Sequence, residues 1–194
     1  MRELSLHILD LVQNSIEAGA SKIALQIVED IQVMDTFLIR ITDNGRGMDE
    51  ATCKSVIDPF VTTRTTHRVG LGLPLIHMST QRCNGHLTIT STLGCGTVVE
   101  ALYQHSHWDR PPLGNIGETI KSIMIANPEL YFTYCHTVDQ AVFSLATQEI
   151  TGILGDLPLT HPDVLIWLHN YLSSNEMNLY KNKNLRGGVQ NENN

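Results

Sequence analysis

Two short stretches carry residue types that could bind a ligand together. Asp10 and Asn14 are four residues apart, so a helix places both side chains on one face. Further along, an Asp-x-Gly-x-Gly turn occupies residues 43–48. Two glycines let the backbone turn sharply and let a flat ligand approach, while the Asp43 carboxylate offers hydrogen-bond acceptors. An asparagine-bearing helix followed by such a turn predicts a nucleotide held between a helix and a sheet.

Each stretch also has an ordinary structural explanation. The first is a predicted amphipathic helix over residues 2–18, with Gly19 at its C-terminal end. Its apolar stripe consists of Leu4, Ile8, Leu11, Val12 and Ile16. Its polar residues Glu3, His7, Asp10, Asn14 and Glu17 are typical of the solvent-facing side of a surface helix. An Asp-Gly turn is common, so neither stretch decides the function alone.

A third stretch adds groups suited to phosphate. Residues 59–70 hold four threonines, two arginines and a histidine with little periodicity, which is typical of a polar loop. This loop leads into Gly70-Leu71-Gly72-Leu73, where the next helix is predicted to begin. Glycine-rich backbone at a helix N-terminus favours anions, because free N–H groups and the helix dipole point at them. A simple linker before a helix would look the same.

The elements around these stretches predict one mixed α+β region. Alternating apolar residues predict strands over 21–29, 36–42, 86–91 and 97–104, the last two joined by a hairpin loop over 92–96. Short helices are predicted over 48–57 and from 72 to about 84.

Five motifs in this order resemble the GHKL superfamily of gyrases, Hsp90-type chaperones, histidine kinases and mismatch-repair ATPases. They are Asp10 to Asn14, Asp43-x-Gly45-x-Gly47, Pro59-Phe60 with Thr62-Thr63-Arg64, Gly70-Leu71-Gly72-Leu73, and Gly94-x-Gly96-Thr97. The resemblance covers residues 1–104. It implies a two-layer α/β sandwich of the Bergerat type, with a mixed four-stranded sheet, helices on one face, and ATP beneath a lid.

The resemblance also implies a role for each matching residue. Asn14 would hold Mg²⁺ against the phosphates, and Asp43 would accept a hydrogen bond from the adenine amino group. Gly45 and Gly47 would let adenine enter, and Thr97 would lie near the same hydrogen-bond network. Residues 60–72 would form the lid over the phosphates, with Thr62, Thr63, Arg64, Gly70, Leu71 and Gly72 as its binding residues.

Two positions depart from the pattern of the GHKL superfamily that the sequence resembles. Glu17 stands where sensor kinases usually have lysine or arginine, so the first motif is closer to the mismatch-repair ATPases. Asp10 stands where hydrolysing members place a glutamate general base, and its side chain is one methylene shorter. We expect Asp10 to be the catalytic residue if the protein turns ATP over.

Composition limits the other classes of function. The formal net charge of −7 argues against a broad basic surface for nucleic acid or an anionic membrane. No apolar run approaches the ~20 residues needed to cross a bilayer, so we expect a cytoplasmic protein. The four cysteines form no Cys-x-x-Cys pair and predict buried, reduced thiols. His105-x-His107 could provide two metal ligands, but no further ligand stands at suitable spacing.

The second half of the chain lies outside the resemblance. Residues 105–115 are predicted to be a linker, residues 116–177 a small α+β module, and residues 178–194 a disordered tail. Within the module the sequence predicts a helix over 116–127, strands over 130–136 and 141–146, a helical turn over 148–154, and a helix over 164–172. At about 60 residues such a module is marginal alone, so we expect it to dock on the first region.

These features leave two functions open. The protein could be an enzyme that hydrolyses ATP or transfers its gamma-phosphate to a partner protein, with Asp10 as base and Asn14 holding Mg²⁺. Alternatively, it could be a nucleotide-gated binding module with little catalysis, whose lid orders on ATP. We expect a protein partner or phosphoacceptor: phosphotransfer predicts a partner that carries an acceptor histidine or serine, whereas simple gating predicts no such acceptor. The oligomeric state stays open.

Overall fold

The computed structural model describes residues 3–57 and 72–181. The N-terminal apolar stripe forms helix α1 (Leu4–Glu17), in which Leu4, Ile8 and Val12 are fully buried. Gly19 adopts φ +80° and donates its N–H to the Ile16 carbonyl at 2.9 Å, which ends the helix. The predicted stripe and end of this helix are therefore confirmed.

The strands and helices predicted for the rest of the first region are present, with bounds shifted by at most two residues. The strands are β1 (Lys22–Asp30), β2 (Thr36–Asp43), β3 (His86–Thr92) and β4 (Gly96–Gln104). The helices are α2 (Glu50–Ser55) and α3 (Gly72–Arg82). Asp49 sets the start of α2, because its carboxylate accepts the Thr52 N–H at 2.7 Å.

The second half adds α4 (Ile116–Ala126), β5 (Tyr131–Val138), β6 (Ala141–Ala146), α5 (Thr147–Leu154) and α6 (Pro162–Lys181). Its strands join the sheet of the first half, which has the order β3-β4-β2-β1-β5-β6. Strand β5 pairs parallel to β1, and the other pairs are antiparallel. The sequence boundary near residue 104 therefore does not coincide with a break in the sheet, and one apolar core spans both halves.

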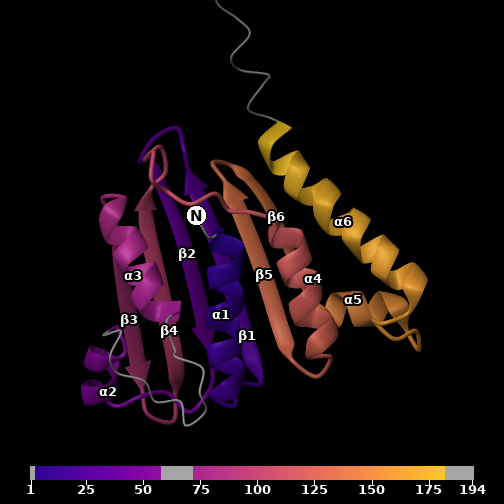
Figure 1. Ribbon diagram of the computed structural model, residues 1–194. Coiled ribbons are helices and arrows are strands. Elements are labelled where there is room, and N and C mark those ends of the chain that lie inside the picture. Colours follow the sequence, from indigo (N-terminus) through magenta and orange to yellow (C-terminus); the bar gives the residue numbers. More distant parts are fainter. Residues whose placement is uncertain (1–2, 58–71, 182–194) are drawn as a thin grey trace, which may run out of the picture.

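All the long helices lie on one face of the sheet (Figure 1). Helix α1 packs between α3 and α4, and α6 lies beyond α4, where it packs against β6. A parallel neighbour for β1 requires a crossover, which the chain makes through residues 105–115 and α4. In the described part of the chain, no helix has the length and apolar character needed to cross a bilayer.

The segment over residues 105–115 also completes the N-terminus of α1. No side chain caps this helix. Instead, the carbonyl groups of Pro112 and Leu113 accept the N–H groups of Leu4 and Ser5 at 2.9 and 2.8 Å. These bonds satisfy two of the donors that a helix start leaves without intrahelical partners. The predicted linker is therefore fastened to the first helix.

Helix α6 is longer than the sequence predicts and continues to Lys181, four residues into the stretch assigned to a disordered tail. Composition suggested disorder because asparagine and lysine dominate this end of the chain. Tertiary contacts override composition here. Leu179 is buried, and the Tyr180 hydroxyl donates to Glu29 of β1.

The continuous core predicts that shortening a buried side chain at the centre of α6 strongly destabilises the protein. Leu168 is fully buried, so Leu168→Ala should lower the free energy of unfolding by about 2–5 kcal/mol. Ile166 on the same helix is 62% exposed, and Ile166→Ala should change this free energy by about 0.5 kcal/mol or less. Denaturant unfolding measures both. Equal small effects would mean that α6 is not part of the cooperative core.

Candidate functional site

The carboxylate of Asp43, at the end of β2, accepts hydrogen bonds from three segments. Its Oδ1 atom accepts the N–H groups of Gly45, at 2.8 Å, and Thr97, at 3.2 Å. Its Oδ2 atom accepts the hydroxyl of Ser15 in α1 at 2.7 Å. An ionised carboxylate has room for about four such bonds, so one acceptor position on Oδ2 remains. The half-buried carboxylate is thus fixed in orientation with one position left for a further donor.

A second serine holds the glycine turn against the β3–β4 hairpin. Ser91 Oγ accepts the Met48 N–H at 2.8 Å and lies 2.9 Å from the Thr97 hydroxyl. In the loop of the hairpin, Gly94 donates its N–H to the Arg46 carbonyl at 2.7 Å. Two backbone groups of the turn are therefore paired with the hairpin, which fixes the turn beside Thr97.

Contacts within the protein leave little room for a side chain at the two glycines of the turn. Gly47 has φ +64°, and a Cβ atom there would overlap the carbonyl group of Thr92. At Gly45 a Cβ atom would stand 3.0 Å from the Cβ of Ala18. Sequence analysis assigned these glycines to a sharp backbone turn and to the approach of a ligand. At Gly47 the structure adds a further requirement, which is close packing on the hairpin backbone.

Helix α3 begins beside the polar face of α1. A Cβ atom on Gly72 would lie 3.4 Å from the Cβ of Asp10 and 3.9 Å from the Nδ2 of Asn14. The last glycine of the Gly70-Leu71-Gly72-Leu73 motif is therefore next to the two helix residues expected to act on phosphate and metal. Asp10 is exposed and Asn14 is half-buried, so a ligand can reach both side chains.

The structure thus places the predicted residues in two adjoining groups. One contains Asp43, Gly45, Gly47 and Thr97, and the other contains Asp10, Asn14 and Gly72. Ser15 links them, because it follows Asn14 in α1 and bonds to Asp43. The remaining predicted residues, Thr62, Thr63, Arg64, Gly70 and Leu71, lie outside the described residues.

Ser15 and Ser91 were missed by sequence analysis. Neither serine belongs to one of the five motifs, and a serine in an amphipathic helix or an alternating strand is unremarkable. A signal did exist for Ser15. It stands at the edge of the apolar stripe of α1, between Val12 and Ile16, where a small hydroxyl side chain must face the sheet.

No group of three or more histidine, cysteine, aspartate or glutamate side chains in residues 3–57 and 72–181 could hold a metal ion. The sequence offered His105-x-His107 as two possible metal ligands. In the structure, His105 instead bonds to Glu29 at 2.7 Å. An ion bound through one or two protein oxygens and a ligand's phosphates needs no such cluster.

Comparison with known families gives a match over residues 2–106, which is more than half of the chain. The matching family is described as histidine kinase-, DNA gyrase B-, and HSP90-like ATPase. The match contains both groups of site residues and ends just after β4. Residues 107–194 lie outside it.

Three curated bacterial proteins are similar to the first region. A putative sensor protein of Shewanella frigidimarina is 30% identical over 109 residues, which is 56% of this chain and 17% of that protein. The autoinducer 2 sensor kinase/phosphatase LuxQ of Vibrio cholerae is 29% identical over 99 residues, 47% of this chain and 11% of that protein. The sensor protein kinase FleS of Pseudomonas aeruginosa is 37% identical over 59 residues, 30% and 14% of the respective chains. The chain matches less than a fifth of the length of each relative.

Two solved structures resemble the fold. One is the N-terminal domain of a DNA repair protein, with a TM-score of 0.48 and 18% identity, over 75% of this chain and 52% of that one. The other is the Aquifex aeolicus MutL ATPase domain complexed with ADP, with a TM-score of 0.45 and 19% identity, over 84% and 66% of the two chains.

The packing of the glycine turn predicts different effects of alanine at two glycines with positive φ. Gly47→Ala should destabilise the protein by more than about 2 kcal/mol, because the strained φ is combined with overlap on Thr92. Gly19→Ala has a similar φ of +80° but open space, so its effect should be about 1 kcal/mol. Thermal unfolding of the two variants measures the difference. Equal losses of stability would contradict the packing role of Gly47.

Proposed function

Because the chain belongs to the family of histidine kinase-, DNA gyrase B- and HSP90-like ATPases, we propose that it binds ATP with Mg²⁺ and hydrolyses it or transfers its gamma-phosphate to a partner protein. The site for this activity is formed by α1, the turn after β2, the start of β4 and the start of α3.

The observation that carries the proposal is the remaining acceptor position on Asp43. Both bonds to Oδ1 come from backbone N–H groups, and one bond to Oδ2 comes from Ser15. A ligand at Oδ2 must therefore donate a hydrogen, because a carbonyl oxygen there would face a negative charge. The exocyclic amino group of adenine supplies such a donor. This requirement favours ATP over a nucleotide with an oxo group at the same position.

The phosphates would extend from this position towards Asn14, Asp10 and Gly72. Mg²⁺ prefers oxygen ligands and usually keeps several waters and phosphate oxygens, so the Asn14 carbonyl fits as a single protein ligand. When bound, the ion neutralises phosphate charge. Asp10 lies one helical turn from Asn14, and its carboxylate can accept a proton from an attacking water or from a hydroxyl of a partner. Its shorter side chain is compatible with action through a bridging water.

Gamma-labelled ATP separates the possible outcomes. With purified protein and cell extract, hydrolysis sends the label to free phosphate, and phosphotransfer sends it to another protein. A nucleotide-gated binding module binds ATP and releases little or no label. The proposed enzyme requires label in free phosphate or in a partner, at a rate that depends on Mg²⁺.

Asp43→Asn tests whether Asp43 accepts a hydrogen bond from adenine. Asparagine can donate as well as accept, so a mismatched polar contact should weaken ATP binding by about 1–3 kcal/mol, measured by calorimetry. Asp139→Asn is a matched control, because Asp139 also accepts two backbone N–H groups, at the opposite end of β1. Unchanged ATP affinity in a folded Asp43→Asn variant would exclude Asp43 as the acceptor.

Asp10→Asn tests the catalytic assignment. The variant should keep Mg²⁺-dependent ATP binding and lose turnover by about 100-fold or more, the usual effect of removing a general base. Asn14→Ala should instead lose the Mg²⁺-dependent part of binding. Asp163→Asn, an exposed carboxylate on α6, serves as control and should turn over ATP at the parent rate. A parent rate in Asp10→Asn would favour the nucleotide-gated module.

A further inference from the structure

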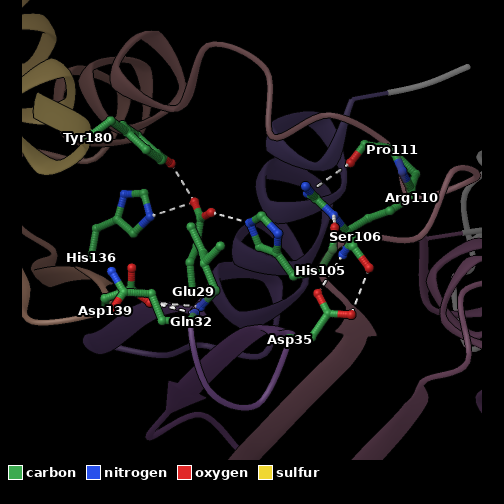
Figure 2. Close-up of polar contacts among 11 residues, drawn as sticks. Glu29, Gln32, Asp35, His105, Ser106, Arg110, Pro111, His136, Asp139 and Tyr180 are labelled. Atoms are coloured by element: carbon green, nitrogen blue, oxygen red, sulfur yellow. Dashed lines mark hydrogen bonds and ion pairs between the residues drawn. The ribbon is translucent and has the colours of Figure 1, made fainter. Parts of the chain in front are cut away.

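Glu29 is a buried carboxylate at the end of β1 that joins three distant segments (Figure 2). Its Oε2 atom contacts Nε2 of His105, just after β4, at 2.7 Å. Its Oε1 atom contacts Nε2 of His136 in β5 at 3.2 Å and accepts the Tyr180 hydroxyl from α6. Only 4% of Glu29 is exposed, so water contributes little to its solvation. These partners must therefore stabilise its charge.

A second carboxylate continues the network into α6. Glu176 Oε2 contacts Nδ1 of His136 at 2.8 Å, and its Oε1 accepts the Tyr134 hydroxyl at 2.8 Å. The fully buried His136 ring thus lies between two carboxylates. Only the doubly protonated, positively charged imidazole can donate to both, because a neutral ring has a single N–H.

The network fastens the last turns of α6 in particular. Nearer its start, α6 is held by buried apolar residues, which are Val164, Leu168 and Leu172. Among the described residues 173–181, Leu179 is the only large apolar residue that is buried, and Met177 is 62% exposed. Glu176 and Tyr180 supply the polar contacts to β1 and β5 in this part of the helix. Docking of residues 173–181 therefore depends on the polar network more than on apolar burial.

The local charges favour the closed network near neutral pH. Burial alone would lower the pKa of His136, but its bonds to Glu176 and Glu29 outweigh burial and raise the pKa to about 8. Burial would also raise the pKa of Glu29, yet its bonds to His136, Tyr180 and His105 lower it to about 2.

The two tyrosine hydroxyls in the network keep their protons across this range. The pKa values of Tyr134 and Tyr180 are raised, mainly by burial, so both phenols remain neutral donors. Arg110, whose guanidinium lies over the Phe37 ring, partly offsets this rise for Tyr180. Cys135 contributes to the rise for Tyr134.

We propose that this cluster is a proton-controlled latch: protonated His136 holds residues 173–181 of α6 on the sheet, and loss of its proton above neutral pH releases them. His136 and Glu29, Glu176 and Tyr180 are the parts of the latch. When His136 becomes neutral, one of the two carboxylates loses the hydrogen bond that His136 donated, and both lose the neighbouring positive charge. The Glu176 carboxylate can then regain hydration when this end of α6 moves into water.

The way in which the stability of the latch changes with pH follows from the pKa shifts of His136 and Glu29. A histidine whose pKa rises on folding stabilises the folded arrangement fully below its unfolded value of 6.5, and this contribution disappears as pH rises through about 8. A carboxyl group whose pKa falls on folding contributes above its unfolded value of 4.5, and this contribution disappears as pH falls towards about 2. The latch is thus strongest between these limits and opens on the alkaline side.

The latch is separate from the nucleotide site. Ile23, near the start of β1, pairs with Asp43, whereas Glu29 is near the other end of the same strand. Opening of the α6 end therefore needs no nucleotide, and the inference does not rest on the proposed ATPase activity.

Hydrogen exchange of the full chain, followed by mass spectrometry from pH 6 to 9, tests the latch. After correction for intrinsic exchange rates, protection of residues 173–181 should fall by up to about 30-fold, the factor that corresponds to a pKa rise from 6.5 to about 8. Protection of β2 and of residues 164–172 should stay constant. Constant protection of residues 173–181 across this range would overturn the proposal.

Three variants identify the group that causes the change of protection with pH. His136→Gln removes the titrating ring and should make protection of residues 173–181 low and independent of pH. Glu176→Gln keeps a bonding partner without its charge, so it should move the transition to lower pH. His169→Gln is the matched control, because His169 is an exposed histidine on α6 bonded to Glu118, and the transition should stay in place. A transition that persists unchanged in both His136→Gln and Glu176→Gln would also overturn the proposal.

Discussion

The carboxylate of Asp43 is the contact on which the candidate site depends. It receives one donor from α1, one from the glycine turn and one from β4, so it fixes three elements relative to one another. The bond from Ser15 also sets the position of Asn14, its neighbour in α1. A change at Asp43 should therefore disturb both the predicted adenine site and the predicted phosphate site. This coupling would let residues far apart in the sequence act on one ligand in the proposed site.

Strand β1 organises the rest of the molecule in a comparable way. It lies between β2 and β5 in the sheet, and its inward residues Ile23, Leu25 and Ile27 are buried under the helices. Its start pairs with the end of β2 that carries Asp43, while Glu29 near its other end joins the histidine and tyrosine cluster. The proposed nucleotide site and the contact that holds α6 thus lie at opposite ends of one strand. The two halves of the chain share this strand, which accounts for their common core.

Local patterns predicted most elements of the fold. The spacing of Leu4, Ile8 and Val12 fixed the buried face of α1, and alternation predicted the strands because each has one covered face. The parallel pairing of β1 with β5 could not be predicted, since it joins segments more than a hundred residues apart and leaves no local pattern. The end of α6 was missed because a single buried residue, Leu179, and one hydroxyl outweigh an unfavourable composition.

The polar networks were only partly predictable. Asp43 and its glycines stand in a recognisable motif, whereas Ser15 and Ser91 are single hydroxyl residues whose roles depend on the approach of another element. Glu29 and His136 occupy inward positions of alternating strands, where an apolar residue is the usual choice. A buried charged residue at such a position is a signal that a partner must exist, but the sequence does not identify the partner.

The central claim is that ATP binds against Asp43 between α1 and the sheet. The most direct test is a titration of the isotope-labelled full chain with Mg²⁺-ATP, followed by NMR of the backbone amides. The account predicts saturable shifts of Gly45 and Thr97, whose N–H groups bond to Asp43, together with Asn14 and Gly72, and little change in residues 173–181. Saturable shifts confined to other parts of the chain, with these four amides unchanged, would contradict it.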